Sequence, residues 1–188
     1  MRLFVAIDVP EEWRREAATA LDRLGAACGA ALRPVDPERM HVTVRFLGEV
    51  EPAAAEALTA SIAAASVGAC SLGLAPAGTF GGRSGPRVVW LGIDAEPGCL
   101  DGMRAAVDRA VDGRLDASGG GEQPWRPHLT LARVRERASA AERQTIAAVV
   151  ASLPVPEAHR FEATTVALYR SHLGSAGPRY ELLARSAV

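Results

Sequence analysis

The chain has 188 residues, 48% of them hydrophobic and 23% charged, which suits one domain spanning residues 1–188. No apolar run approaches the ~20 residues of a membrane-spanning helix, and the formal net charge of −1 excludes a protein that holds long nucleic acids through a general positive field. All 21 basic residues are arginine, which excludes chemistry that needs a lysine amine, such as a Schiff base or an adenylated lysine.

The order of periodic segments along the chain predicts an α+β fold. Seven segments with alternating apolar residues are predicted as strands: residues 2–9, 40–47, 71–80, 87–93, 128–134, 160–171 and 179–186. Four segments with helical spacing are predicted as helices: residues 10–27, 52–66, 99–115 and 139–153. The last of these opens with Ser139 and has Glu142 three residues later, the pattern of a capping box. Strands and helices of this number and order are typical of an α+β protein.

Two further features concern loops and cysteines. The glycine-rich segments 78–86 and 116–124 are predicted as mobile loops. The three cysteines are odd in number, lie far apart and have no histidines beside them, so we expect neither a disulfide framework nor a zinc site. Such cysteine usage fits a reducing cytosol.

A short motif occurs twice, once in each half of the chain. "HVTV" spans residues 41–44 and "HLTL" spans residues 128–131, 87 residues apart. In a strand, residues i and i+2 lie on one face about 6.6 Å apart, so each motif presents its His and Thr to one side and its apolar residues to the core. A repeat of half the chain length predicts two similar lobes related by a pseudo-two-fold axis. This arrangement would bring the two polar faces together across a cleft.

Paired imidazoles, each beside a hydroxyl, indicate displacement at phosphorus. With an unperturbed pKa near 6.5, His41 and His128 can act at one pH as a general base and a general acid on opposite sides of a phosphate. Thr43 and Thr130 can donate to the non-bridging oxygens, so neither a metal nor another cofactor is expected. A zinc site is the alternative, but the motifs supply two nitrogens where three or four ligands are usual. The other histidines lack the threonine and are predicted to be surface or structural residues: His159 and His172.

With these motifs, nearly the whole chain resembles the two-histidine phosphoesterase superfamily. The resemblance is closest to its RNA 2′,3′-cyclic phosphodiesterase branch, also called 2′-5′ RNA ligase. It is carried by "RLFVAID", "MHVTVRFLGEV", "GTFGGRSGPRVVWLGI", "RPHLTLARV" and "LYRSHLGSAGPRYELL". It implies a bilobed fold with two antiparallel-sheet lobes and helices packed outside around a central cleft. The implied activity is metal-independent hydrolysis of an RNA 2′,3′-cyclic phosphate end to a 2′-phosphate, with reversible, ATP-independent 2′-5′ ligation.

The resemblance also implies residue roles: His128 as base, His41 as acid, and Thr43, Thr130 and Arg133 as phosphate ligands. The residues themselves leave open which histidine is the acid. Arg133 is five residues after His128, so strict alternation turns it to the opposite face unless the strand twists, bulges or ends there.

The residues after the first motif raise the same question of parity. Arg45, four residues after His41, has the right parity for the histidine face and could serve in place of Arg133 or lie in solvent. Phe46 resembles a position that stacks on a base, but alternation places it on the other face.

The expected partners are RNA ends or small cyclic-phosphate nucleotides, and we expect a cytoplasmic monomer without membrane contact. Two alternatives stay open from the residues alone. One is the same chemistry on another cyclic phosphate or a 2′-5′-linked oligonucleotide. The other is a non-catalytic module that binds RNA ends.

Overall fold

The computed structural model describes residues 1–112, 125–174 and 177–187. The α-helices are α1 (Glu11–Cys28), α2 (Pro52–Ala64), α3 (Cys99–Val111) and α4 (Ala140–Ser152). Short 3₁₀ turns are η1 (Gly29–Ala31) and η2 (Pro37–Arg39). The strands are β1 (Arg2–Asp8), β2 (Leu32–Pro34), β3 (His41–Glu49), β4 (Cys70–Gly82), β5 (Gly85–Ala95), β6 (His128–Val134), β7 (Phe161–Ala163), β8 (Ala167–His172) and β9 (Arg179–Arg185).

All four predicted helices are present, and α4 begins where the sequence indicates. The Ser139 hydroxyl accepts from the Glu142 backbone N–H, and the Glu142 carboxylate accepts from the Ser139 backbone N–H. This capping box satisfies N–H groups that have no partner within the helix. The last residues of the third predicted helix, 113–115, lie outside the described residues.

The strand prediction was wrong at two places, both because pairing partners are distant in sequence. The predicted strand 160–171 is two strands, since β7 pairs with β4 while β8 pairs with β1. The chain therefore crosses from one edge of the sheet toward the other between them. The short strand β2 was missed, and it exists because it pairs with β6.

The glycine-rich segment 78–86 is not the mobile loop that its composition suggested. Paired strand continues to Gly82 in β4 and resumes at Gly85 in β5, so only Arg83 and Ser84 form the turn. Gly85 has a φ of +93°, which a glycine adopts without strain. The segment is thus the tip of a long hairpin. The other predicted loop, 116–124, lies outside the described residues.

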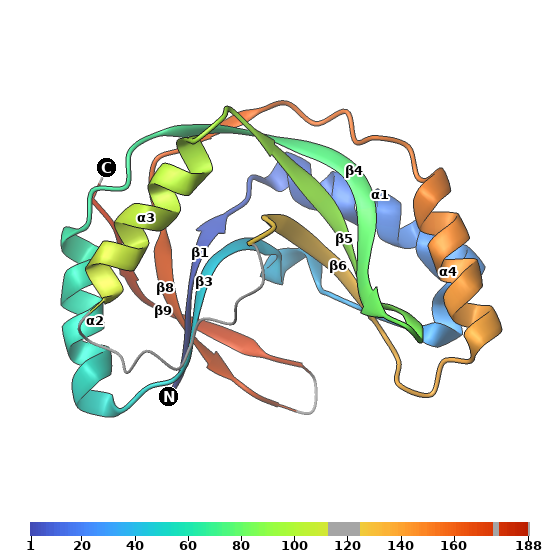
Figure 1. Cartoon of the computed structure of the whole chain (residues 1–188), viewed down its shortest axis with the longest axis horizontal. Coiled ribbons are helices and arrows are strands. Elements are labelled where there is room, and N and C mark those ends of the chain that lie inside the picture. The colour runs from blue at the N-terminus through green and yellow to red at the C-terminus, as the bar shows by residue number, and fades with distance from the viewer. Residues whose placement is uncertain (113–124, 175–176, 188) are drawn as a thin grey trace.

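The strands form a nine-stranded antiparallel sheet whose two halves correspond to the predicted lobes. Its order is β7-β4-β5-β6-β3-β1-β8-β9, with β2 paired to β6. The halves join at the β3–β6 pair through a single register position, Val42 opposite Leu129. Figure 1 places α2 and α3 at one end of the curved sheet and α1 and α4 at the other. The α+β fold with antiparallel strands is confirmed, and the two sets of strands are hydrogen-bonded to each other.

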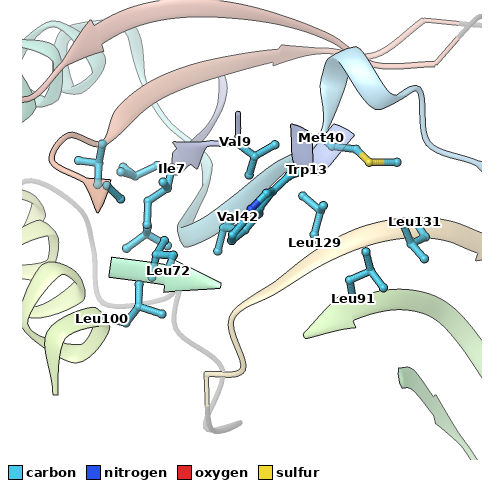
Figure 2. Packing of buried hydrophobic residues seen from close by; sticks show 14 of the residues in the cluster. Ile7, Val9, Trp13, Met40, Val42, Leu72, Leu91, Leu100, Leu129 and Leu131 are labelled. Carbon is cyan, nitrogen blue, oxygen red and sulfur yellow. The ribbon is translucent and has the colours of Figure 1, made fainter. Parts of the chain in front are cut away.

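The apolar residues of the two motifs lie in a hydrophobic core shared by both halves. Val42 and Leu129 are fully buried, and Trp13 of α1 lies in the same cluster (Figure 2). The Trp13 indole N–H donates to the His159 carbonyl oxygen at 3.1 Å, which satisfies its polar atom. The core therefore fixes one face of β3 and β6, while their threonines and histidines lie on the other. Among the described helices, none is long and apolar enough to cross a membrane.

A disulfide links Cys70 and Cys99, which corrects the expectation that the cysteines form no disulfide framework. The two residues are 29 apart in sequence, but Leu72 of β4 pairs with Ala95 of β5. The hairpin thus returns the chain to its starting point, and the first residue of α3 lies beside the first residue of β4. Spacing along the sequence could not reveal this proximity. Cys28 is free and buried.

Candidate active site

The two motifs meet where the halves of the sheet join. Because β3 and β6 are antiparallel and Val42 lies opposite Leu129, the register sets His41 opposite Thr130 and Thr43 opposite His128. The histidines are diagonal neighbours, a relation that in a regular antiparallel pair separates residues by about 7 to 8 Å. Both are half-buried. We call this side of the sheet, defined by His41 and His128, the histidine face.

Each histidine is held through the same ring nitrogen. The His41 Nδ1 lies 2.9 Å from the Arg39 carbonyl oxygen, and the His128 Nδ1 lies 2.7 Å from the Arg126 carbonyl oxygen. A carbonyl oxygen only accepts, so Nδ1 carries the proton in both rings. The Nε2 atoms are then free to take a proton in the neutral ring or to donate one in the charged ring. The two imidazoles are thereby prepared for general acid-base chemistry.

Aromatic side chains pack against each imidazole. Phe4 stacks on His41 with ring centroids 4.8 Å apart, and Tyr180 meets the same ring edge-on at 5.3 Å. In the other half, Phe80 meets His128 edge-on at 4.8 Å, with Trp90 at 6.3 Å. Such packing limits rotation of both rings.

The glycine at position 78 makes room for one of these aromatic rings. Gly78 lies opposite Trp90 in the β4–β5 pair. A Cβ atom at that position would come within 2.3 Å of the indole. The Trp90 ring can therefore lie directly over the backbone of β4.

The threonines lie on the histidine face with their hydroxyls unused by the protein. Thr43 and Thr130 are half-buried. Within the described part of the chain, neither hydroxyl has a hydrogen-bond partner. The Thr43 carbonyl oxygen accepts from the Trp125 indole N–H at 3.1 Å, which ties the segment before β6 to β3. The hydroxyls are available to a bound anion.

Burial lowers the pKa of both histidines, but their charged neighbours differ. The pKa of His41 is lowered by burial and by His128, and raised by its bond to Arg39 and by the Asp8 carboxylate. The pKa of His128 is lowered by burial and by the Arg133 guanidinium, and raised by its bond to Arg126. Asp8 therefore favours the protonated form of His41, while Arg133 favours the neutral form of His128.

A β-bulge brings Arg133 to the histidine face. Trp90 pairs with Thr130 and Val89 pairs with Ala132, so Leu131 is an extra residue in β6. Beyond it, Val88 pairs with Arg133. Because Val88 and Trp90 lie on one face of β5, Arg133 lies on the same side as Thr130. Arg133 is exposed, with no ion-pair partner in the described parts of the chain.

The equivalent bulge in β3 reverses the expected places of Arg45 and Phe46. Ala6 pairs with Thr43 and Val5 with Arg45, so Val44 is the extra residue. Arg45 consequently lies on the opposite face, where its Nη1 contacts the carboxylates of Asp108 in α3 at 2.6 Å and of Asp112, the residue after α3, at 3.2 Å. The prediction that Arg45 has the parity of the site was wrong, for this reason.

Phe46 now shares the histidine face. It lies opposite Phe4 in the register of β1 and β3, with ring centroids 6.2 Å apart, and 59% of its surface is exposed. Phe46 and Arg133 each stand five residues after a motif histidine and two after a bulged residue. They hold equivalent positions in the two halves.

An acidic residue beside His41 was not among the predicted site residues. Asp8 lies opposite His41 in the β1–β3 register. It accepts from the Tyr169 hydroxyl at 2.6 Å and from Arg185 Nη2 at 2.7 Å. Burial and the Asp8 bond raise the pKa of Tyr169 to about 12, so the phenol stays protonated and keeps donating. The signal available in the sequence was a carboxylate at the end of the apolar strand "RLFVAID".

The remaining histidines lie apart from this site and contact carboxylates. His159 Nδ1 is 2.8 Å from Glu12, and His172 Nε2 is 2.6 Å from Glu181. Their placement agrees with the prediction that both are surface or structural residues.

Comparison with known proteins places this geometry in a family. The family model described as the 2′-5′ RNA ligase superfamily matches residues 9–175. The RNA 2′,3′-cyclic phosphodiesterase of Escherichia coli K12 is 32% identical, with 100% of this chain and 96% of that protein covered. The RNA 2′,3′-cyclic phosphodiesterase of Methanocaldococcus jannaschii is 29% identical, with 97% and 98% covered.

Solved structures agree with this assignment. The crystal structure of E. coli LigT in apo form matches with a TM-score of 0.74 at 30% identity, covering 98% of this chain and 95% of that one. Crystal structures of LigT complexed with phosphate and with 3′-AMP also match. With its repeated His-x-Thr motifs on paired strands and a family match over most of its length, the chain belongs to the 2′-5′ RNA ligase superfamily.

Proposed function

We propose that this protein is an RNA 2′,3′-cyclic phosphodiesterase that opens the cyclic phosphate to a 2′-phosphate and a free 3′-hydroxyl. The observation that carries the proposal is the matched pair of imidazoles on one face of the sheet. Each is held through Nδ1 by a backbone carbonyl, which leaves both Nε2 atoms for proton transfer. The relatives named as RNA 2′,3′-cyclic phosphodiesterases supply the substrate class.

In the proposed reaction, water attacks phosphorus and the bond to the 3′-oxygen breaks. His128 Nε2 takes a proton from the attacking water as the new P–O bond forms. His41 Nε2–H gives its proton to the departing 3′-oxygen, which leaves as a hydroxyl. This assignment follows the charges, since Asp8 favours protonated His41 and Arg133 favours neutral His128. General acid-base catalysis of this kind typically contributes about 10²- to 10⁴-fold in rate.

Three side chains are proposed to hold the phosphate, and one to hold the base. The Thr43 and Thr130 hydroxyls donate to the non-bridging oxygens, where negative charge accumulates in the transition state. Arg133 adds a charge-assisted hydrogen bond. Phe46 offers an exposed ring on which the terminal base can stack. No step requires a metal.

The test is turnover of a short RNA that ends in a 2′,3′-cyclic phosphate. We expect the wild-type protein to produce a 2′-phosphate end, identified by its resistance to an enzyme that removes only 3′-phosphates, and to keep its activity after exhaustive chelation. His41→Ala and His128→Ala should each lower kcat by about 10²- to 10⁴-fold. Binding of the RNA end should fall far less.

His159→Ala serves as the matched control, since it removes an imidazole bound to a carboxylate away from the site. Its activity should stay within about twofold of the wild type. A 3′-phosphate product would contradict the proposed direction of opening, and loss of activity on chelation would contradict the metal-free mechanism. Binding without wild-type turnover would favour the alternative of a non-catalytic module.

The same site allows ligation as the second reaction. A 5′-hydroxyl that enters in place of water would attack phosphorus, break the bond to the 3′-oxygen and form a 2′-5′ linkage without ATP. The superfamily name is consistent with this step. Water and relief of ring strain favour hydrolysis in dilute solution. The single domain, the monomeric state and the cytoplasmic location stay predictions.

A further inference from the structure

The surface beside His41 carries positive charge that the hydrolytic step does not use. Tyr180 of β9 lies on the histidine face, with its ring centroid 5.3 Å from His41 and 5.0 Å from Phe4. Within the described residues, its hydroxyl has no hydrogen-bond partner. Burial raises the pKa of Tyr180, while positive charge from Arg133, Arg39 and Arg2 acts in the opposite sense. The charges of three guanidinium groups therefore act on one phenol.

The three arginines come from three different elements. Arg2 shares a face of β1 with Phe4, because residues two apart on a strand point the same way. Arg39 ends η2, and a Cβ atom built at Gly177 would lie 3.0 Å from its Nη1, so the guanidinium lies beside Gly177, two residues before β9. Arg133 comes from β6 and is already assigned to the reacting phosphate. The side chains of Arg2 and Arg39 have no role in the proposed hydrolysis, in which Arg39 takes part only through the backbone carbonyl that holds His41.

The acidic groups near this surface neutralise it only in part. Asp36 contacts Arg39 Nε at 3.4 Å and is the one carboxylate within ion-pair distance of Arg39 in the described part of the chain. Glu49 lies opposite Arg2 in the register but pairs with the N-terminal amine at 3.4 Å. Arg2 itself has no ion pair within the described part of the chain. Although the net charge of the protein is −1, arginine side chains without full neutralisation thus lie together at one edge of its active site.

We propose that Arg2, Arg39 and the ring of Tyr180 form a second phosphate subsite, which binds the phosphodiester one nucleotide upstream of the cyclic end. The proposal rests on the proposed function, because it takes the cyclic phosphate to lie between the two histidines. The surface continues to Leu182 of β9, which is 49% exposed and lies opposite Tyr169 in the β8–β9 register, so it can support the upstream nucleoside. The preferred substrate is then an RNA chain rather than a cyclic mononucleotide.

The test compares three substrates: a nucleoside 2′,3′-cyclic phosphate, a dinucleotide ending in the same group, and that dinucleotide with an uncharged methylphosphonate linkage. Wild-type kcat/KM should be at least tenfold higher for the charged dinucleotide than for the other two. Arg2→Gln and Arg39→Gln should each reduce kcat/KM for the charged dinucleotide by about fivefold or more. Both substitutions keep the backbone carbonyl of residue 39 that holds His41, so both variants should leave the mononucleotide rate within twofold.

Arg170→Gln is the matched control. Arg170 lies in the neighbouring strand β8 but opposite Leu3 in the register, on the other face of the sheet, where it pairs with Glu181 at 4.0 Å. Arg170→Gln should leave kcat/KM unchanged for all three substrates. Added salt should lower kcat/KM for the charged dinucleotide more steeply than for the neutral one, because salt screens a contact to a charged phosphate.

Equal wild-type rates on all three substrates would overturn the subsite while leaving the proposed function intact. An equal loss of kcat/KM on all three substrates in Arg2→Gln would also overturn the subsite. If no cyclic phosphate is opened, the proposed function fails instead. The subsite is then judged by binding of the same three compounds to His128→Ala, where tighter binding of the charged dinucleotide is expected and equal affinities would overturn it.

Discussion

The strands β3 and β6 share a backbone design but differ in the side chains that surround it. Both contain His-x-Thr, both bulge at the residue after the threonine, and both anchor the imidazole through a carbonyl two residues earlier. After the bulge, however, β3 presents Phe46 and β6 presents Arg133. Asp8 lies opposite His41 in the β1–β3 register and favours its protonated form, whereas the positive charge of Arg133 favours the neutral form of His128.

This difference indicates how a symmetric frame can perform an asymmetric reaction. Two identical imidazole environments would give no preference for which ring holds the proton. A negative neighbour at one ring and a positive neighbour at the other supply that preference. The difference at the second residue after the bulge acts in the same way. Phe46 gives one half an aromatic surface for a base, and Arg133 gives the other half a cation for a phosphate. The symmetric backbone brings the two imidazoles together, and the neighbouring side chains decide which imidazole gives the proton and which takes it.

Among the differences between the two halves, the largest effect on kinetics is expected from the side chains that follow the bulges, Arg133 and Phe46. Arg133→Ala removes a charge-assisted hydrogen bond of about 1.5–3 kcal/mol, so kcat/KM should fall roughly 10- to 150-fold. Phe46→Ala removes a stacking surface worth about 1–3 kcal/mol and should act mainly on KM. Steady-state kinetics on a cyclic-phosphate RNA measure both losses.

Two probes tell these roles apart. Inhibition by inorganic phosphate should weaken in Arg133→Ala and stay unchanged in Phe46→Ala. A substrate with an abasic terminal sugar should be cleaved equally by wild type and Phe46→Ala. The proposed division between the halves would be wrong if each variant responded to both probes.

A smaller effect should appear in the pH dependence of kcat/KM, which is expected to be bell-shaped. The acid limb reports loss of neutral His128, and the alkaline limb reports loss of protonated His41. Removing the negative charge in Asp8→Asn lowers the pKa of His41, so the alkaline limb should move to lower pH. Removing the positive charge in Arg133→Gln raises the pKa of His128, so the acid limb should move to higher pH.

Each shift should be about one pH unit or less, since the charges that cause it are partly exposed to solvent. Full pH profiles of the two variants and the wild type provide the measurement. The bell should therefore narrow from opposite sides in the two variants. Movement of the acid limb in Asp8→Asn would indicate that His41 is the base.

The sequence was sufficient to predict the repeated motif, the α+β class and the positions of all four helices, because these depend on local periodicity. It was insufficient where the outcome depends on pairing between distant strands. The division of 160–171 into β7 and β8 is one case, and the meeting of Cys70 with Cys99 is another. Neither is encoded in the spacing of neighbouring residues.

Within the site, the residues of the motifs were predictable and those after them were not. Parity along a strand holds only until an extra residue is inserted, and one bulge exchanges the two faces for every position beyond it. Counting from His41 therefore favoured Arg45 over Phe46, although the resemblance to relatives pointed to Phe46. The bulges at Val44 and Leu131 were required to decide between the two lines of reasoning.

The smallest effect on activity is expected for Arg45, and it tests directly whether the bulge in β3 places Arg45 on the opposite face from His41. Arg45→Ala should leave kcat/KM within about twofold of the wild type, because its guanidinium pairs with Asp108 and Asp112 on the opposite face from His41. These partly exposed ion pairs contribute about 1 kcal/mol or less, so the melting temperature should fall by at most about 4 °C. Thermal unfolding and kinetics of Arg45→Ala and Arg133→Ala, which each remove one arginine, provide the comparison. If Arg45→Ala lost as much activity as Arg133→Ala, the bulge in β3 could not be where the register places it, because Arg45 would then have to share the face of His41.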